Sequence, residues 1–182
     1  MIEADVKAKP AGMEGNYRLY YWRRSGRGAA DVPNTALPSD ASLEKAANEG
    51  VGLSINQKLH DNVGVWLRAG KQRHRVARFD RHASAGAHLS GALVHRPEDT
   101  AGLAYGVTSM GRTYREYLKS SNSRFDAGYE HYFEVYYNIA IGDATGNTGV
   151  HITPDVQYVM NPGGDAVAGK EVIYGVRLQT FF

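Results

Sequence analysis

The sequence predicts an all-β chain whose strands form an antiparallel transmembrane β-barrel. Segments with a two-residue hydrophobic alternation recur along the 182 residues, turn-forming residues separate them, and the connections alternate between long and short. The mean hydropathy is -0.44, and no run approaches the roughly 20 apolar residues that a transmembrane helix requires. Strands would therefore have to form any membrane span.

Eight segments are expected to form strands, and most are about as long as a tilted strand that crosses a bilayer. They are residues 14–23, 51–59, 62–70, 87–96, 101–109, 129–141, 151–160 and 172–182. Outside them, residues 42–50 suggest one or two helical turns, and the rest of the chain shows no helical period.

The connections between these segments differ in length in a regular way. Four long ones are rich in Gly, Ser, Arg and Asp, and three short ones alternate with them: 24–50, 71–86, 110–128 and 161–171 against 60–61, 97–100 and 142–150. Outer-membrane barrels have short periplasmic turns and long extracellular loops. If the last strand descends to the periplasm, every long connection lies outside, and residues 1–13 form a periplasmic turn and the end of a preceding strand.

Alternation divides each strand into an apolar and a polar face. In the last segment Val176 and Leu178 lie on one face, and Arg177 and Gln179 lie on the other. Gln57 is an exception on the apolar side and is tolerable only near a membrane interface. A soluble sandwich or lipocalin-like barrel would bury the apolar face instead, and alternation alone does not separate the two. The pattern of connections favours the membrane barrel.

Composition argues against several other functions. The 21 Lys and Arg are scattered among 19 Asp and Glu, and only residues 71–81 are locally basic, so no nucleic-acid partner is expected. The absence of cysteine excludes disulfides, zinc ribbons and thiol catalysis. The seven histidines show no metal-binding spacing, and no glycine pattern suits a phosphate, so neither a metal nor a cofactor is expected.

Catalysis by paired carboxylates is also weakly supported. Glu130 and Glu134 share a strand face but lie about 13 Å apart at strand rise, beyond the roughly 5 to 9.5 Å of glycosidase carboxylates. A pair of Glu130 with Asp155 across two strands stays open. The sequence therefore predicts a protein that is not an enzyme.

A family resemblance rests on the end of the chain and on five internal blocks. The terminal strand VIYGVRLQTFF ends in Phe182, like the strand that the insertion machinery reads in outer-membrane proteins. The blocks are GNYRLYYWR (15–23), VGLSINQKL (51–59), VGVWLRAG (63–70), HRPEDTAGLAYG (95–106) and HITPDVQYVMNPGG (151–164). Their order and spacing resemble the carbohydrate-selective porin family, the OprB type, over residues 14–182.

The resemblance implies a sixteen-stranded barrel, integral to the bacterial outer membrane, that passes glucose and similar sugars by diffusion. Residues 14–182 would be its C-terminal half, with about eight strands, so the chain is expected to be a fragment whose partner is the missing N-terminal half. Carbohydrate solutes and outer-membrane lipid are the other expected partners, and assembly of the full-length protein into homotrimers is left open. The alternatives are a general diffusion porin and a soluble β-barrel that binds a ligand.

The expected functional residues follow from the polar face. Sugars combine many hydroxyl groups with apolar CH surfaces, so a selective path needs hydrogen-bonding groups and aromatic rings, spread over several weak sites. The expected channel-lining set is Arg18, Tyr20, Trp22, Trp66, Arg68, Arg96, Glu130, Tyr132, Glu134, Tyr136, Asp155, Gln157, Arg177 and Gln179. For each residue alone, the alternative that it merely solvates the channel and pairs across strands stays open.

Overall fold

The computed structural model describes residues 1–24, 47–73, 77–142 and 149–181. These residues form one antiparallel sheet of nine strands, each paired with its neighbours in chain order. The strands are β1 (Ile2–Ala8), β2 (Gly15–Arg24), β3 (Asn48–His60), β4 (Val63–Gln72), β5 (Phe79–Ser90), β6 (Thr100–Met110), β7 (Tyr129–Gly142), β8 (Gly149–Met160) and β9 (Lys170–Phe181). A fold with this order is an up-and-down meander, which confirms the all-β antiparallel prediction.

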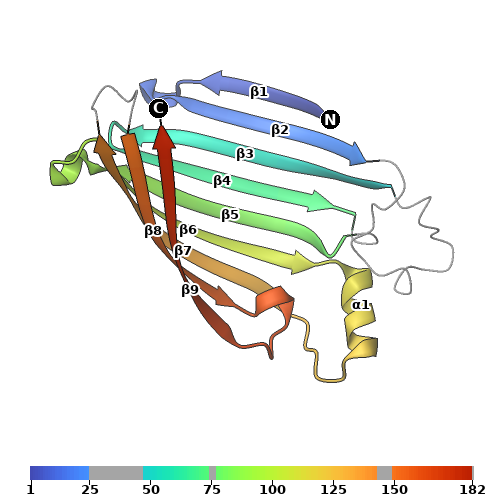
Figure 1. Ribbon diagram of the computed structural model, residues 1–182. Helices are drawn as coiled ribbons and strands as arrows, with labels where there is room; N and C mark the ends of the chain where they lie inside the picture. The colour runs from blue at the N-terminus through green and yellow to red at the C-terminus, as the bar shows by residue number, and fades with distance from the viewer. Residues whose placement is uncertain (25–46, 74–76, 143–148, 182) are drawn as a thin grey trace.

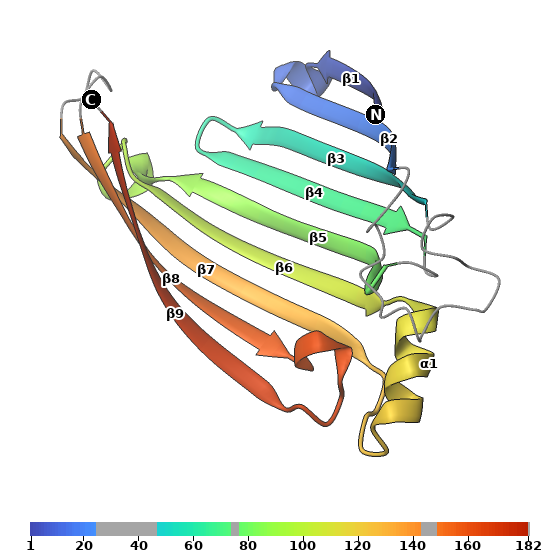
Figure 2. The ribbon, with the colours of Figure 1, turned by 45° about the vertical axis from the view of Figure 1, so that its right-hand side comes forward.

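The sheet is strongly curved and open. Figures 1 and 2 show β1 and β9 at its two edges, and in the described residues neither edge strand has a partner on its outer side. Helix α1 (Arg112–Ser121) lies at one end of the sheet in the β6–β7 connection, and the tight β3–β4 turn lies at the other. We call these the loop end and the turn end.

Four differences from the predicted elements have local causes. The chain has nine strands because residues before Met13 contribute β1, which pairs over its whole length with β2. β5 begins at Phe79 and ends at Ser90, earlier than expected. The prediction missed its first half because the outer-face positions Ala83, Ala85 and Ala87 are weak strand signals. The 110–128 connection contains α1, whose Tyr114, Tyr117 and Leu118 repeat at helical spacing. Residues 42–46 lie outside the described part, and β3 already begins at Asn48.

The loop lengths also change with the position of β5. The β4–β5 connection covers only residues 73–78, whereas the β5–β6 connection covers 91–99 and includes a short 3-10 turn, Gly91–Val94. The alternation of long and short connections is therefore weaker in the structure than in the sequence-based assignment.

Large apolar side chains cover one face of the sheet and remain exposed. One row runs across eight strands through directly opposed residues: Tyr17, Ile55, Leu67, Ala85, Tyr105, Phe133, Tyr158 and Val172. Leu103 and Leu178 are 47% and 66% exposed on the same face. We call this the outer face and the opposite one the inner face. Among the described residues, the only buried apolar side chains are Ala77, Ala104, Met110 and Phe125, so this single-layer sheet has no conventional core.

Gln57, the polar exception on the outer face, lies near the turn end of β3, opposite Gly15. Its Oε1 accepts a hydrogen bond from the Tyr17 hydroxyl, and its Nε2 donates to the Lys58 carbonyl at 2.7 Å. The amide is thus satisfied within the protein rather than left bare among apolar groups.

Candidate functional site

The cross-strand register gathers the polar side chains of the inner face into continuous rows. One row joins Asp5, Arg18, Ser54, Arg68, Ser84, Gly106 and Tyr132 from β1 to β7. The next row toward the turn end joins Lys7, Asn16, Asn56, Trp66, Gly86, Ala104, Glu134 and Gln157 from β1 to β8. Side chains that are far apart in sequence therefore form one polar wall.

Large inner-face rings lie over glycines of the adjacent strand. A Cβ at Gly86 would lie 2.6 Å from the Trp66 ring, and one at Gly50 would lie 2.8 Å from Nε1 of Trp22. Tyr20, Tyr132 and Tyr136 cover Gly52, Gly106 and Gly102 in the same way. Because a glycine has no side chain, each ring can lie flat against the sheet instead of standing up from it. The wall presents ring faces as a result.

Arg68 is held rigidly next to one of these rings. Its Nη1 donates to the carbonyls of Ile55 at 2.7 Å and Leu67 at 3.0 Å, and its Nη2 donates to Oδ1 of Asn56 at 2.7 Å. The guanidinium lies 5.4 Å from the centroid of the Trp66 ring. A planar cation fixed by several hydrogen bonds beside an indole can orient a hydroxyl-bearing solute with little loss of side-chain freedom.

Three buried polar atoms near Arg68 have no hydrogen-bond partner among the described residues. They are Oδ1 of Asn16, Nε of Arg18 and Oγ of Ser54. Arg18 and Ser54 are directly opposed across β2 and β3, and Asn16 follows in the next row. Buried polar atoms without a partner are costly, so a water molecule or a solute hydroxyl would gain free energy by occupying this position.

A second polar region spans β6 to β9. Its cavity of about 450 Å³ is lined by Glu98, Thr100, Glu134, Tyr136, Asn138, His151, Thr153, Asp155, Arg177 and Gln179. Nδ2 of Asn138 donates to Oγ1 of Thr153 at 2.8 Å, which joins β7 to β8 inside it. Donors and acceptors are thus mixed here, with one guanidinium among carboxylates.

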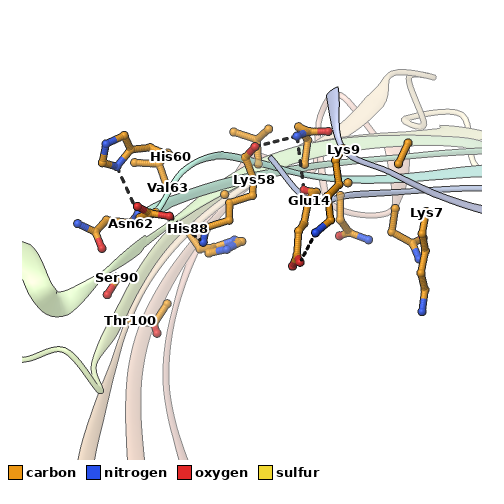
Figure 3. Close-up of a pocket in the computed structure, with 18 residues that line it drawn as sticks. Lys7, Lys9, Glu14, Lys58, His60, Asn62, Val63, His88, Ser90 and Thr100 are labelled. Atoms are coloured by element: carbon orange, nitrogen blue, oxygen red, sulfur yellow. Dashed lines mark hydrogen bonds and ion pairs between the residues drawn. The ribbon is translucent and has the colours of Figure 1, made fainter. Parts of the chain in front are cut away.

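A further cavity, of about 750 Å³, opens at the turn end and is shown in Figure 3. Lys7, Lys58 and His88 contribute basic groups to it from β1, β3 and β5. Lys58 forms an ion pair with Asp61 at 3.1 Å. Residues from β1 to β6 line this one cavity, so the inner face is concave.

Most of the expected channel-lining residues lie together on the inner face. Arg18, Tyr20 and Trp22 come from β2, Trp66 and Arg68 from β4, Glu130, Tyr132, Glu134 and Tyr136 from β7, Asp155 and Gln157 from β8, and Arg177 and Gln179 from β9. The register also contradicts a Glu130–Asp155 pair. His131 is opposite Met160 and Tyr136 is opposite Asp155, so the two carboxylates are separated by about 20 Å at strand rise.

Arg96 differs from the expectation, because the strand ends before it. It lies in the β5–β6 connection, where its Nε and Nη2 donate to Asp99 at 2.5 and 3.1 Å and its Nη2 donates to the Ala140 carbonyl at 3.2 Å. Asp99 is 1% exposed and also accepts from the Tyr137 hydroxyl at 2.8 Å and the Ala140 amide at 2.9 Å. Arg96 therefore fixes the turn to β7.

These contacts also change the acidity of Asp99. The hydrogen bonds from Arg96 hold the pKa of this carboxyl far below its ordinary range, and the Ala140 amide and the Tyr137 hydroxyl act in the same direction against the effect of burial. A carboxylate with this many donors stays ionised under all ordinary conditions.

Sequence reasoning missed several inner-face residues, including His82. Its Nδ1 and Nε2 lie 3.2 Å from Oγ1 of Thr108 and 3.0 Å from Oγ of Ser84, and its ring stacks on that of Tyr132. The alternation of His82, Ser84, Gly86 and His88 could have indicated this strand, but small residues weakened the signal. Phe182, the expected insertion signal, lies outside the described residues.

The described part of the chain contains no helix long and apolar enough to cross a membrane. It also contains no group of three acidic or histidine side chains that could hold a metal ion.

Comparison with known proteins gives one family and one structure. The family model described as carbohydrate-selective porin, OprB family, matches residues 1–182. The fold is similar to a high-pH structure of Pseudomonas putida OprB, with a TM-score of 0.77 and 20% sequence identity over 98% of this chain. The match covers 47% of that chain, so this chain spans about half of its length. Among curated proteins, none matches the sequence.

Proposed function

Since this chain belongs to the carbohydrate-selective porin family, OprB, we propose that it forms part of the wall of an outer-membrane channel through which sugars such as glucose diffuse passively. The outer face would contact lipid, the inner face would contact solute, and the loop end would lie outside the cell. One observation carries the proposal: the inner face sets fixed donors beside flat ring faces, whereas the outer face is apolar and exposed.

The chemistry of a sugar fits the wall between β2 and β4. The Trp66 ring offers an apolar surface to sugar CH groups, and the adjacent Arg68 offers N–H donors to hydroxyl groups. Arg18 and Ser54, in the row of Arg68, each have a buried polar atom without a partner among the described residues. Glu134 and Gln157 continue the row of Trp66 with acceptors. Conduction requires many such weak contacts in sequence rather than one tight pocket.

The directions of the edge strands constrain how the barrel closes. The first residue of β1, Ile2, pairs with Tyr21 near the loop end of β2, and β9 also begins at the loop end, so the two edges run in the same direction. A closed antiparallel barrel has an even number of strands. Further chain would therefore have to add an odd number to these nine, and seven would complete the sixteen that the family resemblance implies. A second copy would instead place β9 parallel to β1.

Liposome swelling with the complete porin that contains this chain tests the function. We expect glucose to permeate faster than an amino acid of similar size. Trp66→Ala should lower the glucose rate several-fold, because it removes the flat apolar surface that the CH groups of the sugar would contact. Leu67→Ala is the matched control, because Leu67 is the next residue on β4 and lies on the outer face.

Each other outcome has a definite meaning. Equal rates for glucose and the amino acid would indicate a general diffusion porin. An equal effect of Trp66→Ala and Leu67→Ala would contradict the assignment of sugar contacts to the inner face. A chain that stays soluble without detergent and shows no flux would overturn the channel itself and favour a soluble ligand-binding protein.

A further inference from the structure

The outer face gains two cationic side chains within one row of residues at the loop end of β2 to β6. The last apolar row consists of Leu19, Leu53, Ala69, Ala83 and Val107. The next row toward the loop end consists of Tyr21, Val51, Lys71, Arg81 and Ser109. Consecutive rows on one face are two residues apart along each strand, or about 7 Å. Two cationic side chains thus lie next to an apolar surface that acyl chains can contact, on its side nearer the loop end.

Lys71 and Arg81 are directly opposed across β4 and β5. Directly opposed side chains on one face have Cβ atoms about 5 Å apart, and like charges in such a pair are destabilising. Both residues are exposed, and 64% of the Arg81 side chain is accessible. This costly arrangement is explained if an anion binds between the two groups.

Acidic groups of the described residues neutralise this pair only weakly. The carboxylate nearest to Arg81 is that of Asp80, at 3.9 Å from Nε, and its other oxygen accepts from Oγ of Ser109 at 3.0 Å. Lys71 forms no ion pair with any described side chain. The local charge is therefore available to an external partner.

The adjacent row nearer the loop end adds two arginines, of which one forms no ion pair among the described residues. It contains Arg23, Glu49 and Arg73. The Glu49 carboxylate forms an ion pair with Nε of Arg73 at 3.7 Å and accepts a hydrogen bond from the Tyr21 hydroxyl at 2.8 Å. Arg23, opposite Glu49 in the register, is exposed and forms no ion pair within the described part of the chain.

Among the described residues, the turn end of the same strands has no such pair of cations on the outer face. There, the outermost row of directly opposed residues is His60, Val63, Leu89 and Ala101, which contains one imidazole and neither Lys nor Arg. The cationic group therefore belongs to one membrane surface only, the surface that faces the loop end.

We propose that Lys71, Arg81 and Arg23 bind the phosphate of a phosphorylated lipid headgroup in the membrane leaflet at the loop end. This inference rests on the proposed function, which places lipid against the outer face. A phosphate offers three oxygens that can accept from two or three cations at once, and its acyl chains would lie on the apolar rows below. An inner-face solute could not reach these side chains, which point away from the channel.

The test uses the complete porin in detergent micelles that carry lipid A, a bisphosphorylated glycolipid, or its monophosphorylated form. Native mass spectrometry would measure retained lipid. We expect the bisphosphorylated form to bind more tightly. The double substitution Lys71→Gln with Arg81→Gln should weaken that binding about 30-fold, because each basic group near an anionic lipid contributes about 1 kcal/mol of binding free energy.

Arg112→Gln with Lys119→Gln is the matched control. It removes the same charge at the same end of the sheet, from the exposed positions of α1 rather than from the outer face. Equal weakening by both double variants would indicate diffuse attraction and overturn the site. Equal retention of the two lipids by the unaltered porin would also overturn the site. This measurement does not depend on whether a substituted protein folds.

Two parallel measurements separate this inference from the proposed function. Inorganic phosphate that displaces the lipid at equal concentration would indicate a simple anion site and contradict a lipid headgroup site. Glucose flux with no preference between the lipids would overturn only the lipid site, whereas selective lipid binding without glucose flux would overturn only the sugar channel.

Discussion

The inner and outer faces of the sheet are built from alternate residues of the same strands, yet they pack by different rules. On the outer face, medium and large apolar side chains stand side by side in rows and remain exposed. On the inner face, large rings lie across glycines of the neighbouring strand, and Arg68 is held by a backbone carbonyl. The outer face is thus fitted to a fluid apolar solvent, whereas the inner face is a fixed polar surface.

The two faces also differ in what a change of one side chain would disturb. An outer-face residue interacts mainly with the surrounding medium, so its polarity should matter more than its shape. An inner-face glycine contacts a specific ring, so added volume should matter more than polarity. Adjacent residues on one strand allow this contrast to be tested directly.

The largest effect is expected from a charge on the outer face. Val156→Arg should lower the free energy of unfolding by about 2 to 4 kcal/mol, because Val156 is 44% exposed on the face assigned to lipid. Gln157→Arg, one residue further along β8 on the inner face, should change it by less than about 1 kcal/mol. Urea unfolding of the complete porin in lipid vesicles measures both. Equal costs would contradict the assignment of the two faces.

A smaller effect on the free energy of unfolding is expected at the turn end of the sheet, beyond the two faces. Asp99→Ala would leave the Ala140 amide without its acceptor, at a cost of about 1 to 3 kcal/mol in the free energy of unfolding. Asp61→Ala is the control at an exposed turn position.

The same site predicts a dependence on pH. Because the pKa of Asp99 is lowered in the folded chain, its contribution to stability is complete above the ordinary aspartate pKa of about 3.9 and is lost as the pH falls below that value. Asp99→Ala should therefore lose less stability than the unaltered protein between pH 5 and acidic pH of about 2 to 3. Thermal unfolding over this range measures the difference, and identical pH profiles would rule out this role of Asp99.

The smallest effect tests whether added volume at an inner-face glycine lowers the stability of the protein. Gly86→Ala should cost about 1 to 2 kcal/mol in the free energy of unfolding, because its Cβ would lie 2.6 Å from the Trp66 ring and from the Leu103 carbonyl. Gly70→Ala is matched, since Gly70 is also on the inner face and its Cβ would meet only the Val51 carbonyl at 3.6 Å. Comparable costs in urea unfolding would show that strand glycines matter for backbone reasons alone.

Several features could be predicted from the sequence because they depend only on alternation within a strand. The 129–141 segment matches β7 closely, and Phe133, Val135 and Glu134 separate onto the expected faces. The residues that define the inner face at β2 and β4 follow in the same way. A two-residue period fixes the face of a side chain once its strand is identified.

The strand boundaries of β5 and the role of Arg96 could not be obtained in this way. Small residues from Ala83 to Ala87 gave little hydrophobic contrast, so the predicted strand began eight residues late and included Arg96. Only the folded chain shows that Asp99 and Ala140 hold Arg96 in a turn, because these partners come from distant positions.

By itself, the sequence determined that the chain forms strands with one apolar and one polar face, because hydrophobic alternation is a local property. Tertiary structure alone decided that Trp66 lies on Gly86, that Arg68 reaches the Ile55 carbonyl, and that Lys71 is opposite Arg81. Each of these contacts depends on the register between neighbouring strands. Register is set by pairing along the whole length of both strands. Alternation within either strand does not fix it, because a shift by an even number of residues keeps every side chain on the same face.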